Sequence, residues 1–149
     1  MYWGAFCKKG VSVLVPVYGN QNADKYQQTL KNHLLPFKNA CFQGSCIFMQ
    51  DGASIHTANS TKQWLEDNDI TIMDWPAHSP DLNPIENLCG NLSRAVYQQN
   101  RQFKNVHELH TCVMDAWGKI TRKDCYDLVA SMPRRVYQVT ERQKKKTDY

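Results

Sequence analysis

The alternation of short apolar runs with helical stretches restricts the fold of this chain more than any other feature of its sequence. The chain opens with two apolar, β-branched segments, residues 2–7 and 11–18, which flank a short basic turn with glycine and are typical of a β-hairpin. From Asn22 to about Leu35, apolar and aromatic residues recur at helical spacing, which predicts a helix that ends at Pro36. A hairpin followed by a helix favours a fold that combines both kinds of element.

The rest of the chain continues this alternation and then becomes helical. A buried-strand run at 46–49, a helix from Thr57 to Asn68 and a short strand at 70–73 are predicted next. Residues 75–84 hold three of the six prolines, which predicts a rigid loop. Helices are then predicted at 84–99, 105–118 and 122–132. This order indicates the α/β class, with a mixed sheet, flanking helices and a helical C-terminal end.

The composition excludes several classes of protein. With 149 residues, of which 42% are hydrophobic and 21% charged, the chain fits one domain with a core of its own. No apolar run reaches the roughly 20 residues of a membrane span, so the sequence does not predict an integral membrane protein. None of the six cysteines forms a C-x-x-C pair, which favours free thiols in a reducing compartment over a zinc ribbon or a disulfide framework.

The net charge of +4 is confined to the C-terminal end of the chain. Residues 1–133 contain equal numbers of acidic and basic side chains, whereas residues 134–149 hold six basic residues against two acidic ones. A basic terminus of this kind binds a phosphate backbone or serves as a nuclear-import patch, or it is a solvated tail that keeps the protein soluble. Both interpretations stay open. The six basic residues are Arg134, Arg135, Arg142, Lys144, Lys145 and Lys146.

Asp51 is the first candidate for chemistry, because it directly follows the buried-strand run. An acid at the carboxyl end of a strand in an α/β sheet lies at the edge where such folds bind their ligands. The alternative is structural, since Asp51-Gly52 is also a common turn signal. Taken alone, the residue favours the turn. His56, five residues later, either contacts a phosphate, orients the site, or is an ordinary hydrogen-bonded loop histidine.

Glu86 is the second candidate, at the start of a predicted helix. Asn83 is a good N-cap, Pro84 suits the first helical position, and Glu86 at the third position completes a variant capping box. Capping alone explains the residue. Asp51 and Glu86 are separated by 34 residues that contain one α-β unit, a connection that can bring both carboxylates to the same sheet edge. Such a pair suits Mg²⁺ and the two-metal transfer of a phosphodiester.

Two sequence blocks resemble the signature motifs of mariner-superfamily (Tc/mariner) DNA transposases of the nematode type. The first is Gln-Asp-Gly-Ala-Ser-Ile-His-Thr at 50–57, and the second, longer and more specific, runs from Trp75 to Leu88. The spacing between Asp51 and Glu86 is similar to that between the second and third catalytic acids of the family. The likeness extends over essentially the whole chain.

The resemblance implies an RNase H-like (retroviral integrase-like) fold and a DD-E triad that uses Mg²⁺ or Mn²⁺. Asp51 corresponds to the second acid and Glu86 to the third, and Asp81 is expected to fix the proline-rich loop. The implied substrate is double-stranded DNA, namely transposon ends and a TA target, with no small-molecule substrate. The implied location is the nucleus, and the implied partners include a second copy of the chain.

The resemblance also identifies a departure from the family pattern. The first acid of the family lies on the strand before Trp3, so we expect residues 1–149 to be a partial catalytic domain without its first strand. The RNase H-like core covers about 1–100, and a helical extension covers about 101–149. Two hypotheses follow: a truncated DNA endonuclease and strand transferase, or a non-catalytic remnant that binds DNA or a transposase. A third, an unrelated metal-dependent hydrolase that uses Asp51, Glu86 and His56, is disfavoured by the long proline-rich block. Unpaired strand edges predict marginal stability or self-association.

Overall fold

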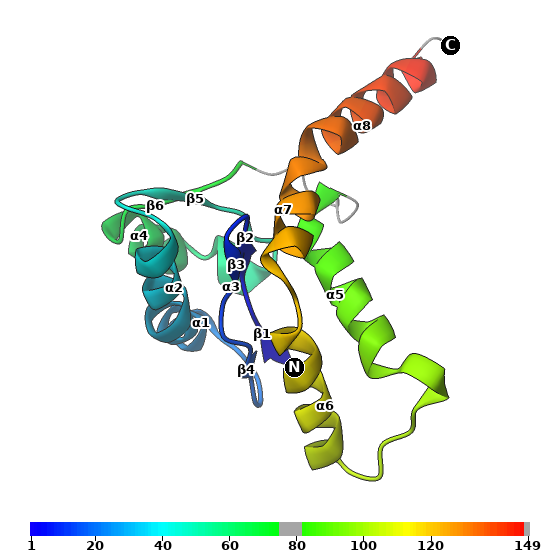
Figure 1. Cartoon of the computed structure of the whole chain (residues 1–149). Helices are drawn as coiled ribbons and strands as arrows, with labels where there is room; N and C mark the ends of the chain where they lie inside the picture. The colour runs from blue at the N-terminus through cyan, green and yellow to red at the C-terminus, as the bar shows by residue number, and fades with distance from the viewer. Residues whose placement is uncertain (75–81, 148–149) are drawn as a thin grey trace. The chain divides into compact units, whose positions relative to one another are not determined.

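The computed structural model describes the backbone of residues 1–74 and 82–147, with side chains described as far as Glu141 (Figure 1). The chain divides into two compact units. The first unit combines Met1–Ala5 with Ser12–Ser79, and the second combines Phe6–Val11 with Pro80–Tyr149. Each unit has its own buried residues.

The predicted N-terminal hairpin is present as two short antiparallel ladders. Its base is β1 (Tyr2–Trp3) paired with β4 (Val15–Pro16), and its tip is β2 (Phe6–Cys7) paired with β3 (Gly10–Val11). Between the ladders the chain crosses from one unit to the other, and the backbone N–H of Ser12 donates to Ala5 O at 2.8 Å. The backbone N–H of Ala5 in turn donates to Ser12 Oγ at 2.9 Å, so a buried serine replaces a regular ladder bond.

The helix predicted for residues 22–35 is confirmed, but its predicted end at Pro36 is wrong. The helix begins as α1 (Ala23–Thr29), widens into the π-helical segment η1 (Leu30–Leu34) and continues as α2 (Leu35–Cys41). In the wide turn the N–H of Leu35 bonds to Leu30 O, five residues back. A proline lacks the N–H and normally clashes with the carbonyl four residues earlier. Because the π turn widens the helix just before Pro36, the helix accommodates the ring and continues.

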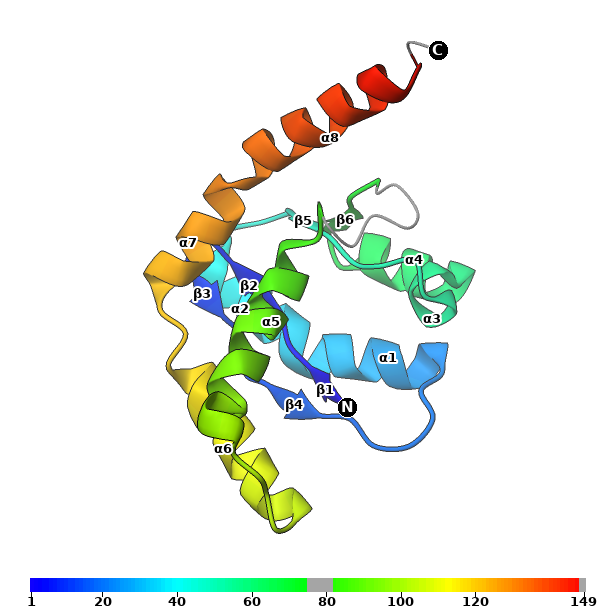
Figure 2. The same cartoon turned by 90° about the vertical axis from the view of Figure 1, so that its right-hand side faces the viewer.

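The two predicted strands after this helix form a parallel pair. β5 (Cys46–Phe48) lies beside β6 (Ile70–Ile72), with Cys46 opposite Ile70. The crossover contains two helices instead of the single predicted one, α3 (Ser54–Thr57) and α4 (Asn59–Asp67), because Ala58 takes an extended conformation with ψ 137°. Both helices pack on α1 (Figure 2). The core of this unit consists of Ala5, Tyr26, Leu30, Leu34, Leu65 and Ile70.

The second unit contains the predicted helical C-terminal part of the chain. Its helices are α5 (Pro84–Val96), the short 3-10 segment η3 (Gln98–Asn100), α6 (Val106–Gly118), α7 (Arg122–Ala130) and α8 (Met132–Thr147). α5 packs on α6 and α7, around the buried side chains of Leu88, Val96, Trp117 and Cys125. α5 ends earlier than predicted, because its C-cap Tyr97 leaves helical geometry with ψ 17°. Gln99, in the 3-10 segment that follows, adopts φ 60°.

Helix α8 lies in the part of the chain for which a helical extension was expected, about 101–149, although the helical periodicity indicated individual helices only as far as residue 132. The backbone is helical from Met132 to Thr147, so the basic residues at 134–147 lie on a helix (Figure 1). In residues 1–74 and 82–147, no helix is both long and apolar enough to cross a membrane. The six cysteines are free thiols.

Candidate active site

The Asp51 carboxylate lies just after β5 and is held by two donors. The backbone N–H of Ala53 donates to Asp51 Oδ1 at 3.0 Å, and His56 Nδ1 donates to the same oxygen at 2.6 Å. Within the described parts of the chain, Asp51 Oδ2 accepts no hydrogen bond. The side chain is 64% exposed. Asp51 therefore makes the turn that its Asp-Gly sequence indicated, and still presents one oxygen to solvent.

His56 is the neighbour that fixes this carboxylate. Its side chain is only 18% exposed, and its ring packs on the Tyr26 ring with centroids 4.3 Å apart and planes at 37°. A carboxylate can only accept hydrogen bonds, so the hydrogen shared with Asp51 belongs to His56 Nδ1. Of the roles considered for this histidine, the geometry is that of a residue that orients Asp51.

Tyr26 and Gln50 complete the surroundings of Asp51, and the sequence did not identify either as a functional residue. Tyr26 Oη donates to Gln50 Oε1 at 2.8 Å, and Gln50 Nε2 donates to His56 O at 3.1 Å. Burial raises the pKa of Tyr26 above its ordinary value, and the negative charge of Asp51 raises this pKa further. The hydroxyl therefore keeps its proton. A tyrosine on the apolar face of a helix was the available signal, because a buried hydroxyl requires a partner.

Glu86 occupies the first turn of α5 and is exposed. The predicted cap is confirmed, since Asn83 Oδ1 accepts from the N–H of Ile85 at 3.2 Å. The predicted capping box is wrong, because the Asn83 side chain bonds to the second helical residue rather than the third. Over the described residues, no donor reaches the Glu86 carboxylate. The positive end of the helix is what stabilises this charge.

The other expected residues divide into those that the structure describes and those that it does not. Asp81 lies outside the described residues. Arg134 and Arg135 belong to α8, and the guanidinium of Arg135 donates to Asn87 Oδ1, next to Glu86 in sequence. This contact fixes the start of α8 to the first turn of α5. Arg142 and Lys144–Lys146 lie on the helical backbone of α8, but their side chains are outside the described part of the chain.

Each of the two carboxylates has the donor chemistry that Mg²⁺ or Mn²⁺ prefers. Asp51 lies in the first unit and Glu86 in the second, and each is exposed. Neither carboxylate forms an ion pair with a lysine or arginine in the described segments, which leaves oxygen ligands for a hard cation. The same segments contain no group of three or more His, Cys, Asp or Glu side chains that could hold a metal ion. Asp51 and Glu86 thus fit a metal as partial donors.

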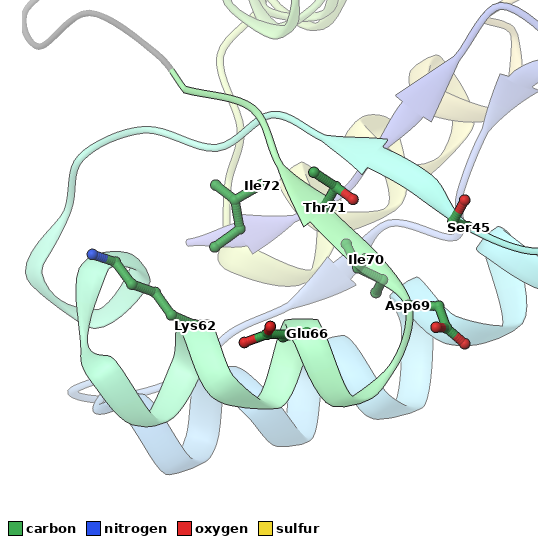
Figure 3. Close-up of a pocket in the computed structure, with 7 residues that line it drawn as sticks. All are labelled: Ser45, Lys62, Glu66, Asp69, Ile70, Thr71 and Ile72. Carbon is green, nitrogen blue, oxygen red and sulfur yellow. The ribbon is translucent and has the colours of Figure 1, made fainter.

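A pocket of about 420 Å³ lies elsewhere in the first unit, between α4 and β6 (Figure 3). Lys62 and Glu66 line it from α4, and Asp69 and the β6 residues line it from the other side. Its lining includes none of the residues predicted for the site. The Asp51 cluster is therefore a separate feature.

Comparison with known proteins identifies the family of this chain. Residues 1–110 match the family described as DDE superfamily endonuclease. The Transposable element Tc3 transposase of Caenorhabditis elegans is 38% identical over 149 residues, which are 100% of this chain and 45% of that protein. The Transposable element Tcb1 transposase of Caenorhabditis briggsae is 29% identical over 149 residues, 100% of this chain and 54% of that protein. The chain thus spans about half the length of the curated relatives it matches.

Solved structures show the same fold. The catalytic domain of Mos1 mariner transposase superposes with a TM-score of 0.73 at 21% identity, over 91% of this chain and 76% of that chain. The Mos1 catalytic domain with Raltegravir and Mg gives a TM-score of 0.75 at 22% identity, over 89% of this chain and 69% of that chain. The predicted RNase H-like α/β fold is confirmed. The match over residues 1–110 shows that this chain belongs to the DDE superfamily endonucleases, with the Tc1/mariner transposases of nematodes among its relatives.

Proposed function

We propose that this chain supplies the second and third acids of a metal-dependent DNA endonuclease and strand transferase that acts in DNA transposition and integration. The observation that carries the proposal is Asp51, an exposed carboxylate at the exit of β5 whose Oδ1 accepts from two donors and whose Oδ2 accepts from none of the described residues. Both Asp51 and Glu86 lie inside the segment that matches the DDE endonuclease family. The relatives are transposases of transposable elements.

In this proposal each residue of the site has its own role. Asp51 and Glu86 offer carboxylate oxygens to Mg²⁺ or Mn²⁺, and His56 holds the Asp51 carboxylate in one orientation. Asn83 begins the helix that carries Glu86, and Asp81 belongs to the adjoining motif. A bound divalent cation supplies activation of a water or 3′-hydroxyl nucleophile and stabilisation of the leaving oxygen. Mos1, a relative in fold, has been solved with Mn and with Mg.

The proposed partner is double-stranded DNA, namely transposon ends and a TA target, in the nucleus. Mos1 has been solved as a paired-end complex with the left transposon end and as a strand transfer complex. In this chain the excess of positive charge lies in residues 134–149. We propose that these basic residues contact the phosphate backbone. The slope of the DNA-binding constant against salt concentration, both on logarithmic scales, then reports how many phosphates they contact. A dimer of two copies is part of the same proposal.

The proposal is tested by Mn²⁺-dependent nicking of a labelled DNA duplex. The purified chain is compared with a version extended upstream through the strand that carries the first acid of the family. Asp51→Ala and Glu86→Ala should abolish nicking in whichever version cuts. Asp24→Ala and Asp115→Ala, which remove exposed acids elsewhere, should leave nicking unchanged.

Two outcomes would contradict the proposal. Nicking that survives Asp51→Ala or Glu86→Ala would remove that acid from the chemistry. No nicking by either version, together with retained binding of the duplex in a gel-shift assay, would favour the alternative of a non-catalytic DNA-binding remnant.

A further inference from the structure

Asp51 is linked to three other side chains by a ring of contacts. Two of these side chains, Tyr26 and Gln50, have no role in the function proposed above. The contacts run from Asp51 to His56, from His56 to Tyr26 through ring packing, from Tyr26 to Gln50, and from Gln50 back to His56. We propose that Tyr26 and Gln50 are positioning residues that hold His56, and through it the Asp51 carboxylate, ready for a divalent cation. The inference rests on the proposed function of Asp51.

The group that these contacts position is the Asp51 carboxylate. Both donors, the N–H of Ala53 and Nδ1 of His56, bond to Oδ1. With Oδ1 occupied in this way, the rotation of the carboxylate is restricted and Oδ2 is the oxygen left for a metal ion. A ligand whose orientation is fixed before binding loses less conformational freedom when the ion binds.

The histidine is held at two points, by its ring and by its backbone. Tyr26 provides a flat surface for the ring, with centroids 4.3 Å apart. Gln50 Nε2 donates to the backbone carbonyl of His56 at 3.1 Å, which restrains the short helix α3. Thr61, whose Oγ1 donates to Ile55 O at 2.8 Å, restrains the same turn from α4.

One arrangement of hydrogens satisfies the contacts of the Gln50 carboxamide. Nε2 must face the His56 carbonyl in order to donate, so Oε1 faces Tyr26 and accepts from its hydroxyl. The tyrosine hydroxyl keeps its proton because burial raises its pKa. Tyr26 is 5% exposed and belongs to the core of the first unit. The orientation of a solvent-facing acid is thus anchored in the core.

Two conservative variants separate positioning from packing. Tyr26→Phe keeps the ring against His56 and removes only the donor to Gln50. Gln50→Met keeps the length of the side chain and removes both of its hydrogen bonds. Tyr18→Phe and Gln28→Met make the same chemical changes at other sites and serve as matched controls, since Tyr18 is 79% exposed and the Gln28 side chain donates to Asn32 on the same helical stretch.

The first measurement is the hydrogen position on the His56 ring, read from its ¹⁵N chemical shifts. The wild-type chain should show hydrogen on Nδ1. Both variants should shift toward hydrogen on Nε2, and both should bind Mn²⁺ roughly 3- to 10-fold more weakly, whereas the controls should match wild type. Unchanged ring signals and Mn²⁺ affinity in both variants, with folded spectra, would overturn the inference.

Failure of the inference can be distinguished from failure of the proposed function. If Asp51→Ala abolishes nicking while Tyr26→Phe and Gln50→Met retain wild-type ring signals, Mn²⁺ affinity and nicking, only the positioning role is wrong. If the two variants shift the His56 signals and weaken Mn²⁺ binding although no version cuts DNA, the positioning role stands and the nuclease assignment is wrong.

Discussion

The surroundings of Asp51 and Glu86 differ although both acids lie in the segment that matches the DDE endonuclease family. Asp51 is held by side chains and backbone from several elements, with Tyr26 in the core behind it. Glu86 is placed by the helix that carries it, and its carboxylate receives no donor from the described residues. One acid is oriented by a network of side chains and the other by the backbone of one helix. The first depends on tertiary packing, whereas the second depends on a local cap.

The largest expected effects come from the cores beneath the two acids. Leu30 is fully buried in the first unit and Leu88 is 1% exposed in the second, on the helix of Glu86. Leu30→Ala and Leu88→Ala should each lower the free energy of unfolding by about 2–5 kcal/mol, because each leaves a cavity. Urea titration measures both losses. Only Leu30→Ala should also change the ¹⁵N signals of the His56 ring. A change of those signals in Leu88→Ala but not in Leu30→Ala would show that the core of the first unit does not hold His56.

The next largest effect is on the affinity for Mn²⁺, and it tests the support of Asp51 without touching Glu86. His56→Ala removes a donor to Asp51, and loss of a residue that supports a metal ligand typically weakens binding by about 10- to 100-fold. Calorimetric titration with Mn²⁺ should show this loss. His107→Ala serves as the control, since His107 is an exposed histidine in the first turn of α6. Equal Mn²⁺ affinity in His56→Ala and wild type would show that Asp51 does not need its partner.

The cap beneath Glu86 should matter less. Asn83→Ala removes the acceptor for the N–H of Ile85, and loss of an N-cap costs about 1 kcal/mol. Thermal or urea unfolding should show that Asn83→Ser, which also caps, recovers most of the stability. Wild-type stability in Asn83→Ala would mean that the Pro84 start of α5 suffices without the side chain.

The smallest effect compares two acids at the same helical position. Asp124 completes a capping box with Thr121 in α7, whereas Glu86 completes none in α5. Hydrogen bonds from the Thr121 hydroxyl and backbone N–H hold the pKa of Asp124 below its ordinary value of 3.8. The pKa is thus lower in the folded chain than in the unfolded chain. The stability that Asp124 contributes is therefore present above pH 3.8 and is lost as pH falls through the folded pKa.

Urea midpoints measured across that pH range test this difference. Asp124→Asn should be less stable than wild type at neutral pH, and the difference should shrink as the pH falls below 3.8. Glu86→Gln should lose less stability at neutral pH than Asp124→Asn, because the Glu86 carboxylate makes no hydrogen bond to the described residues and only the start of its helix stabilises its charge. A pH-dependent stability loss in Glu86→Gln that matches Asp124→Asn would show that Glu86 is a capping residue after all.

The same contrast explains what the sequence could predict. Local patterns predicted the N-cap Asn83, the acid after β5 and most of the strands and helices, and these appear in the structure. The continuation of the helix through Pro36 depends on a π turn that residue periodicity does not indicate. The contact of Tyr26 with Gln50 joins residues 24 positions apart, so no local pattern specifies it. Asp51 was therefore predictable as a candidate, but the side chains that orient it were not.

The proposed function requires that Asp51 and Glu86 serve one metal-dependent reaction. The most direct test is to follow NMR signals of the full chain while substoichiometric Mn²⁺ is added, since the ion broadens signals near its ligands. The account predicts broadening of the His56 ring and of the Asn83 side-chain amide together, and loss of both effects in Asp51→Asn. Broadening near Glu86 that persists in Asp51→Asn, or no broadening at either acid, would contradict the claim.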